Sequence, residues 1–229
     1  PSRIVEECGD MRPYRGERQD AEVRILGRDR VRVSLPADAT TVSPADAREF
    51  AEAVPGYVHT PVVGSLPPAR EGKLGVYVGG ADASRRRSVA TVVAPWAAAN
   101  PDRLKEVESA AAAATGKLLA NLALAVTIEG FKEALVLGES QGLSEADVVD
   151  MLGSTGLEFI VNMKSPFLLG ERSTSPGDFT ADAIAKDARL MLASSDKELP
   201  AVRAALTSLE AQQDAGRGDE DFSTVVVNR

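Results

Sequence analysis

The chain has 229 residues, of which 26% are charged and 44% are apolar, and its net charge is −8. This composition is typical of a folded protein with one large domain or two small ones, and the acidic balance argues against a nucleic-acid partner. A single cysteine, Cys8, excludes a disulfide within the chain, and a single histidine, His59, weakens any interpretation as a metal site. We expect no membrane span, no metal and a cytoplasmic location.

Residues up to about 100 alternate short β-branched runs with turn residues. The predicted strands are 31–35, 56–63 and 74–78, and the predicted helices are 45–54 and 84–99. Ser43 and Pro44 form a typical helix start, with a hydroxyl cap followed by proline at the first position. Strands that alternate with helices predict a parallel sheet.

Strand signals end after about residue 105, and the rest of the chain predicts helices. One long helical pattern runs from 106 to 141, and a second helix begins at Ser144, with Asp147 in a capping-box position. Further helices are predicted at 156–169, 179–194 and 199–215. The sequence therefore predicts an α/β domain over residues 1–105 and an all-α domain over residues 106–229.

Lys117 and Asn121 lie four residues apart within an apolar run of the long helix, so their side chains share one face. Lysine is rarely buried without a partner, so an ammonium group there indicates proton chemistry on a small oxygen-bearing substrate. The alternative is a lysine whose stem lies along the helix while its amine reaches water. Asn121 alone would be read as a helix–helix contact.

Several motifs occur in a characteristic order along the chain. They include Thr40-Thr-Val-Ser-Pro44, Thr60-Pro-Val-Val-Gly-Ser65, Lys117-Leu-Leu-Ala-Asn121, Lys186-Asp187 and Gly218-Asp-Glu-Asp-Phe-Ser223. Although each motif alone is weak, the ordered set resembles the β-hydroxyacid dehydrogenases, the group of 3-hydroxyisobutyrate dehydrogenase and glyoxylate/succinic semialdehyde reductase.

The resemblance implies an N-terminal Rossmann-like domain, incomplete in this chain, followed by a helical domain built around one long helix. It also implies an NAD- or NADP-dependent oxidoreductase that interconverts a small β-hydroxy acid and its carbonyl form, usually as a dimer or tetramer. For this chain we expect a homodimer through the helical domain. Lys117 is then the general acid/base, and Asn121 binds the substrate and orients the lysine. A desolvated lysine near positive charge has a pKa shifted toward neutrality, which suits this role.

The resemblance assigns the remaining site residues one by one. Thr41 lies beside the nicotinamide, while Phe179 and Lys186 belong to a segment that folds back over the cofactor. The loop Val63-Gly64-Ser65 grips the substrate through backbone amides. The cofactor contacts also include Leu35 and Pro36, at the end of the predicted strand 31–35, and Arg28. An arginine at the position of Arg28 accommodates a 2′-phosphate and favours NADP over NAD.

The sequence departs from the family pattern in three ways. Val63 replaces the serine that hydrogen-bonds the substrate, which predicts a different and less polar substrate. The Gly-x-Gly-x-x-Gly fingerprint that cradles pyrophosphate is absent. The segments 31–38 and 39–44 also abut, where the family has a helix and a strand between them. Either segments of the protein are missing from this sequence, or cofactor binding has been lost.

Two other functions remain open at this point. An imine reductase shares the architecture but usually carries a different residue at the position of Lys117. A non-catalytic dimer would explain Val63 and the absent glycines. The pair Lys186-Asp187 is equally compatible with an exposed ion pair and with cofactor contact.

Overall fold

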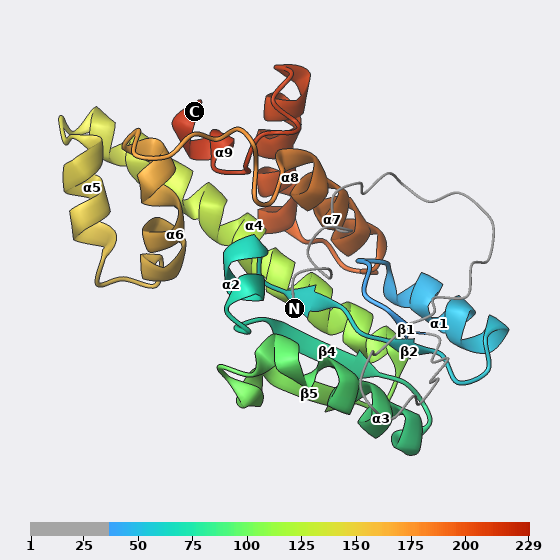
Figure 1. Cartoon of the computed structure of the whole chain (residues 1–229). Helices are drawn as coiled ribbons and strands as arrows, with labels where there is room; N and C mark the ends of the chain where they lie inside the picture. Colours follow the sequence, from blue (N-terminus) through green and yellow to red (C-terminus); the bar gives the residue numbers. More distant parts are fainter. Residues whose placement is uncertain (1–36) are drawn as a thin grey trace.

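The computed structural model describes residues 37–229 (Figure 1). Its five-stranded sheet has the order β1-β2-β4-β3, with β5 also paired to β4. These strands are β1 (Ala37–Asp38), β2 (Val58–His59), β3 (Val62–Val63), β4 (Gly75–Gly79) and β5 (Leu104–Val107). β1 pairs with β2, and β4 with β5, in parallel, but β4 is antiparallel to both β2 and β3. The predicted parallel sheet is therefore confirmed only for the pairs β1–β2 and β4–β5, and the sheet is mixed because the short connection through residues 64–74 returns β4 in the direction opposite to β3.

Two helices of the N-terminal half begin where the sequence predicts. α1 (Pro44–Ala53) starts at Ser43, whose hydroxyl accepts from the backbone of Asp46 while the Asp46 carboxylate accepts from the backbone of Ser43. α3 (Ala83–Val93) is capped by Asp82 and continues into a short 3-10 turn, η1 (Ala94–Ala97). A five-residue helix, α2 (Leu66–Arg70), follows the loop 63–65 and was not predicted.

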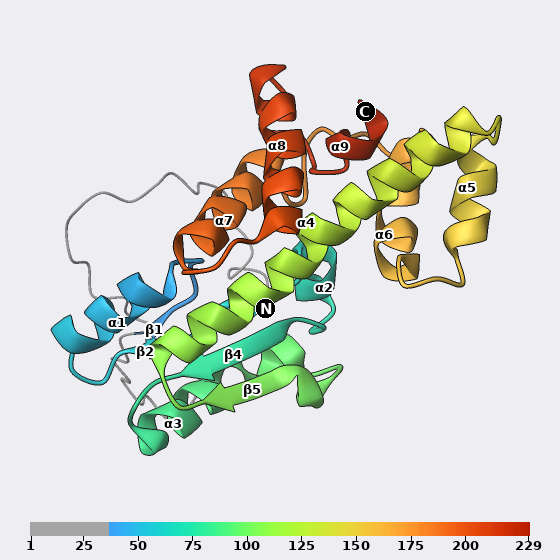
Figure 2. The ribbon, with the colours of Figure 1, turned by 180° about the vertical axis from the view of Figure 1, so that it is seen from behind.

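The sheet separates α3 from the long helix α4 (Ala110–Ser140) (Figure 2). Val76 and Val78 point to the α3 side and form an apolar cluster with Val89 and Val93. The glycines of β4 face the other way. A side chain at Gly79 would collide with the backbone of Ser109 and with Ala113, and one at Gly116 would lie 3.0 Å from the Tyr77 ring. The sheet and α4 therefore touch closely because these positions lack side chains.

The junction between the two halves differs from the prediction. We expected the long helix to begin at residue 106, but Leu104–Val107 forms β5 and the helix begins at Ala110, capped by the Ser109 hydroxyl. β5 is paired with β4 along its whole length. The charged residues within this short strand, Lys105 and Glu106, are exposed, so it lacks the apolar pattern that would have marked it.

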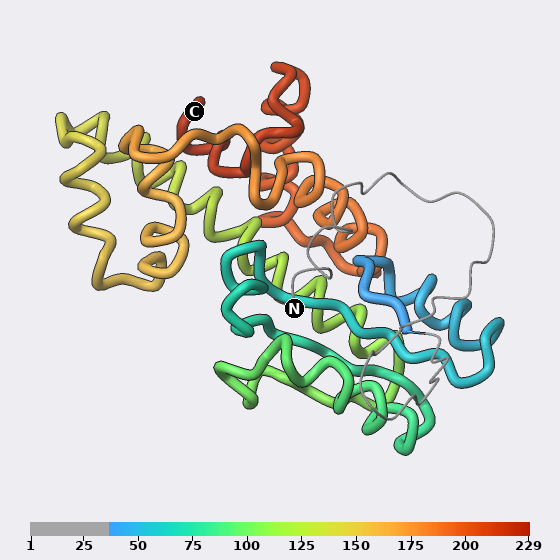
Figure 3. Tube along the Cα trace, in the orientation of Figure 1, coloured from blue at the N-terminus to red at the C-terminus, as the bar shows by residue number. Residues whose placement is uncertain are grey.

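The C-terminal half is helical and is arranged around α4 (Figure 3). The other helices are α5 (Glu145–Leu152), α6 (Glu158–Leu168), α7 (Ala181–Ala193), α8 (Pro200–Asp214) and α9 (Thr224–Val227). Ser144 and Asp147 form the expected capping box. By length and composition alone α4 is apolar enough to cross a membrane, but Ile128, Phe131 and Leu135 form part of the core that α4 shares with α7 and α8.

A buried ion pair joins α6 to the segment before α9. Lys164 Nζ lies 2.6 Å from Asp221 Oδ1, and both side chains are almost fully buried. The ammonium group also lies 4.0 Å from the centre of the Phe222 ring. Asp221 accepts a further hydrogen bond from the backbone of Ser223. These contacts hold the C-terminal segment, which had been predicted only as a turn-rich exit, against the helical core.

Candidate active site

Lys117 lies in the N-terminal third of α4, one residue after the glycine that touches Tyr77. Its ammonium group donates to Asn121 Oδ1 at 3.3 Å, so the predicted pair does meet on one face of the helix. Lys117 is half-buried and Asn121 is 2% exposed. Burial lowers the pKa of Lys117, the negative charge of Asp187 opposes this shift, and the positive charge of Lys186 adds to it.

Asp187, from α7, completes this arrangement. Its Oδ2 accepts from Asn121 Nδ2 at 2.5 Å, and its side chain is 2% exposed. An amide whose nitrogen is held by a carboxylate must turn its oxygen the other way, here toward Lys117. Asp187 therefore sets the orientation of the Asn121 amide. The sequence left Lys186-Asp187 open between an exposed ion pair and cofactor contact, and neither interpretation gave Asp187 this orienting role. The one signal for the role was the apolar spacing of α7, which places Asp187 on the buried face.

Lys186 links α7 to the turn that precedes α1. Its ammonium group lies 2.7 Å from Asp187 Oδ1 and donates to the backbone carbonyl of Thr41 at 3.1 Å. Thr41, predicted beside the nicotinamide, is thus connected through Lys186, Asp187 and Asn121 to Lys117. The structure brings these five residues together from three segments that are far apart in the sequence.

The predicted substrate loop follows β3, which contacts α4. Val63 is half-buried and paired with Gly75 on β4. Gly64 has a φ of 130°, and a side chain there would meet Leu74 at 2.7 Å, so this position requires glycine. The hydroxyl of Ser65 makes no capping hydrogen bond to α2. No hydrogen bond between described residues joins this loop to Lys117, so its role as a substrate clamp stays a prediction.

Other predicted residues lie apart from this network or outside the described residues. The Phe179 ring packs edge-on against Phe222 at 5.8 Å, within the helical core. Its backbone N–H approaches Asp221 rather than any residue bonded to Lys117. Arg28, Leu35 and Pro36, with the predicted strand 31–35, lie outside the described residues.

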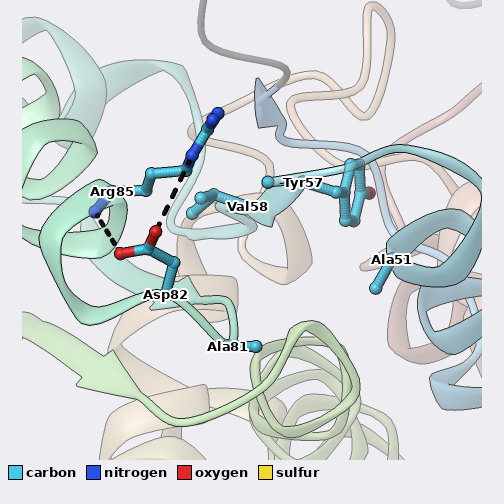
Figure 4. A pocket seen from close by; sticks show the side chains of 7 residues that line it. Ala51, Tyr57, Val58, Ala81, Asp82 and Arg85 are labelled. Carbon is cyan, nitrogen blue, oxygen red and sulfur yellow. Dashed lines mark hydrogen bonds and ion pairs between the residues drawn. The ribbon is translucent and has the colours of Figure 1, made fainter.

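A cavity of about 250 Å³ lies between the N-terminus of α3 and the end of α1 (Figure 4). Its lining includes Tyr57, Asp82 and Arg85, and it contains no predicted site residue. Asp82 already accepts from the backbone N–H groups of Ser84 and Arg85, so the helix N-terminus is satisfied by the protein itself. This cavity is therefore separate from the site around Lys117.

The described residues fit the nicotinamide half of a dinucleotide. Lys117 brings an amine whose pKa is lowered by burial, and Lys186 connects it to Thr41 from a second segment. The residues that would cradle pyrophosphate would precede residue 37 in the order of the family pattern, outside the described residues.

Comparisons with known proteins agree with this geometry. The chain is 28% identical to glyoxylate/succinic semialdehyde reductase 1 of Arabidopsis thaliana over 82% of its length and 66% of the relative. It is 28% identical to 3-hydroxyisobutyrate dehydrogenase of Pseudomonas aeruginosa, over 83% of its own length and 67% of that protein. The chain therefore spans about two thirds of the length of these relatives.

The fold matches that of solved structures with the same architecture. The structure of 3-hydroxyisobutyrate dehydrogenase from Mycobacterium tuberculosis with L-serine superposes with a TM-score of 0.71, at 27% identity over 84% of this chain and 68% of that chain. This confirms the two-part fold, with a Rossmann-like part followed by a helical domain on one long helix. Residues 111–228, just over half of the chain, match the family described as "NAD-binding of NADP-dependent 3-hydroxyisobutyrate dehydrogenase", and the chain belongs to that family.

Proposed function

We propose that this protein is an NAD(P)-dependent oxidoreductase that interconverts a small β-hydroxy acid and its carbonyl form, with Lys117 as general acid/base. The observation that carries the proposal is the chain of contacts from Lys117 through Asn121 to Asp187. A half-buried amine with a lowered pKa, held by an amide that is itself oriented, suits a group that must gain and lose a proton in each turnover. Its relatives carry the names of such enzymes.

The nicotinamide supplies or accepts the hydride when it is bound. In the oxidation, neutral Lys117 accepts the proton of the substrate hydroxyl, and in the reduction its ammonium form returns that proton. Asn121 keeps the amine directed into the site by accepting one of its hydrogen bonds. Burial lowers the pKa of Lys117, and the negative charge of Asp187 limits this shift, so that the ammonium form remains accessible.

We assign the substrate side to the loop Val63-Gly64-Ser65 and the cofactor side to Thr41, Lys186 and Phe179. Val63 offers a methyl surface where the family pattern has a hydroxyl, which favours a substrate with an apolar substituent next to its reacting carbon. NADP is the favoured cofactor, because the family is described as NADP-dependent and Arg28 provides a positive charge in the sequence. We place the reaction in the cytoplasm, because the single cysteine provides no disulfide within the chain of the kind that indicates an oxidising compartment.

The test compares Lys117→Met with wild-type protein. Turnover is measured with 3-hydroxyisobutyrate and NADP, and with glyoxylate or succinic semialdehyde and NADPH. Loss of the general acid/base lowers kcat by roughly 10²–10⁴-fold. NADPH affinity, measured by fluorescence titration, is expected to stay within about twofold. Lys117→Arg should be equally inactive, because arginine does not release its proton in proteins.

The matched control is Lys132→Met, on the same helix. Lys132 contacts Glu129 and Ser208 and lies outside the network of Lys117. Its replacement should leave kcat unchanged. Full activity of Lys117→Met, or an equal loss in the control, contradicts the proposal. A wild-type chain that binds neither NADPH nor NADH points to the non-catalytic alternative.

We also infer a homodimer formed through the helical half. Large apolar side chains are exposed on three of its helices: Leu119 (60%), Leu137 (67%), Met151 (59%) and Phe159 (72%). The three helices, α4, α5 and α6, contact one another, and exposed large apolar side chains on neighbouring helices are candidate interface residues. Leu137→Glu together with Phe159→Glu should produce monomers in sedimentation velocity, while the exposed Leu66→Glu on α2 should not. Unchanged dimers in the double variant, or a monomeric wild type, contradict this assignment.

A further inference from the structure

His59, the single histidine of the chain, is fully buried at the end of β2. It lies in register with Asp38 on β1 and with Gly79 on β4. Its Nδ1 is 3.1 Å from the Tyr57 hydroxyl, while its Nε2 is buried and has no hydrogen-bond partner. A buried imidazole with one unpaired nitrogen requires an explanation beyond its place at the end of a strand.

The Tyr57 hydroxyl determines which imidazole nitrogen carries the proton. Its oxygen lies 3.3 Å from Asp38 Oδ2, and an ionised carboxylate only accepts hydrogen bonds. The single phenolic proton is therefore given to Asp38, and the phenolic oxygen accepts from His59. This requires a proton on Nδ1 and none on Nε2. The unpaired atom is then a lone pair rather than a buried N–H, which native proteins tolerate better.

Asp38 connects these hydrogen bonds to the turn that precedes α1. Its carboxylate accepts from the backbone N–H of Thr40 at 3.0 Å and from the Thr40 hydroxyl at 2.8 Å. Its backbone carbonyl accepts from the N–H of Thr60 at 2.7 Å. The next residue, Thr41, is the one whose carbonyl is bound by Lys186. The turn is therefore held on one side by Asp38 and on the other by α7.

We propose that His59 is a positioning residue that acts through Tyr57 and Asp38 to hold the Thr40–Thr41 turn in the shape that receives the nicotinamide end of the cofactor. Only the identity of the ligand that the turn receives, a nicotinamide cofactor, rests on the proposed function. The relay consists of three side chains on β1, on β2 and directly before β2: His59 donates to Tyr57, and Tyr57 donates to Asp38, which only accepts. Phe50 packs edge-on against the Tyr57 ring at 6.0 Å and supports its orientation.

The first test reads the tautomer directly and needs neither cofactor nor turnover. Because the chain has one histidine, protein labelled with ¹⁵N-histidine gives the signals of a single imidazole. The proposal expects a protonated Nδ1 and an unprotonated Nε2, with the Nδ1 signal altered in Tyr57→Phe. A proton on Nε2 in the wild-type protein overturns the relay.

The second test measures what the relay does. Tyr57→Phe removes the hydroxyl that links His59 to Asp38 and keeps the ring. NADPH affinity, measured by fluorescence titration, should weaken about tenfold, the effect of one lost hydrogen bond in a positioned site. The KM for NADPH should rise by the same factor while kcat changes less than twofold. His59→Asn keeps a donor near the position of Nδ1 and should retain near-wild-type affinity, whereas His59→Leu should behave like Tyr57→Phe.

The control is Thr224→Val, which removes a buried hydroxyl that donates to Gln212 in the helical half. It should lower the unfolding midpoint as Tyr57→Phe does and leave NADPH affinity unchanged. Equal affinity of Tyr57→Phe and wild type shows that the cluster is only structural, and overturns the proposal while the proposed function stands. A wild type that binds no dinucleotide, although its His59 has the expected tautomer, overturns the proposed function and the assignment of the turn to a cofactor.

Discussion

Asn121 Nδ2 lies 2.5 Å from Oδ2 of Asp187, a residue 66 positions later in the chain, and this contact joins α4 to α7 beside Lys117. Both side chains are almost fully buried. An amide that is held at its nitrogen has a single orientation, so its oxygen is presented to Lys117 without a choice between two flipped states. The Lys117 amine is thereby positioned by a residue to which it makes no hydrogen bond.

Loss of the Asp187 carboxylate should impair turnover more than cofactor binding. Asp187→Ala leaves the Asn121 amide buried and without its acceptor, which costs about 1–3 kcal/mol and corresponds to a fall in kcat of roughly 5–150-fold. Asp187→Asn still offers an oxygen to Asn121 and should retain most of kcat. Steady-state kinetics with NADPH titration measures both. An alanine variant as active as the asparagine variant would refute the orienting role.

The charges of Asp187 and Lys186 should move the pH profile in opposite directions. Oxidation requires neutral Lys117, so its rate rises with pH through the pKa of that amine, which burial lowers below its usual value. Asp187 raises this pKa and Lys186 lowers it. Asp187→Asn should therefore shift the rising limb to lower pH, and Lys186→Met should shift it to higher pH. The effect of Lys186 is reduced by solvent, because its side chain is 52% exposed.

The pH dependence of kcat for hydroxy-acid oxidation measures these shifts. The control is Lys132→Met, because the Lys132 ammonium group lies outside the network. This variant should leave the apparent pKa of the pH profile unchanged. Shifts of the same sign in the two test variants would exclude Lys117 as the group that titrates.

Val63→Ser should change substrate preference rather than the chemical step. The added hydroxyl restores a hydrogen-bond donor where the family pattern has serine. A polar substrate such as 3-hydroxyisobutyrate should then bind about tenfold more tightly, seen as a lower KM with kcat little changed. Val63→Ala, which removes methyl groups without adding a hydroxyl, is the control. A similar fall in KM for both variants would show that space, not hydrogen bonding, governs the preference.

The pair Lys164–Asp221 should affect stability without affecting the site. Lys164→Met leaves a carboxylate buried without its partner, and breaking such a pair costs about 3–5 kcal/mol. Adding Asp221→Asn removes the stranded charge, so the double variant should be more stable than Lys164→Met alone. Urea unfolding of the two variants provides the comparison. A double variant less stable than either single variant would mean that hydrogen bonding, not charge, dominates at this pair.

Local signals in the sequence predicted most of the helices. Ser43 and Ser144 mark their helix starts because a hydroxyl cap acts within three residues. Lys117 and Asn121 could be paired for the same reason, since four residues make one helical turn. In each case the interacting groups lie close together in the chain, so spacing alone carries the information.

Contacts between distant segments could not be predicted in this way. No spacing rule relates Asn121 to Asp187, or Lys186 to Thr41, because α7 is brought to α4 by the packing of the whole helical core. β5 was missed because its charged residues give it no apolar pattern, and it is defined instead by its pairing with β4. The predicted strand 56–63 was divided at Pro61, which has no N–H to donate.

Gly79 and Gly116 limit which residues can be substituted where the sheet contacts α4. A methyl group at Gly79 has no free space, and one at Gly116 would press on the Tyr77 ring one residue before Lys117. Any displacement of the helix caused by a larger residue would be transmitted directly to the Lys117 amine. Tolerance to mutation should therefore be lowest at two residues that carry no functional group, and a saturation screen for activity would find them among the most restricted positions.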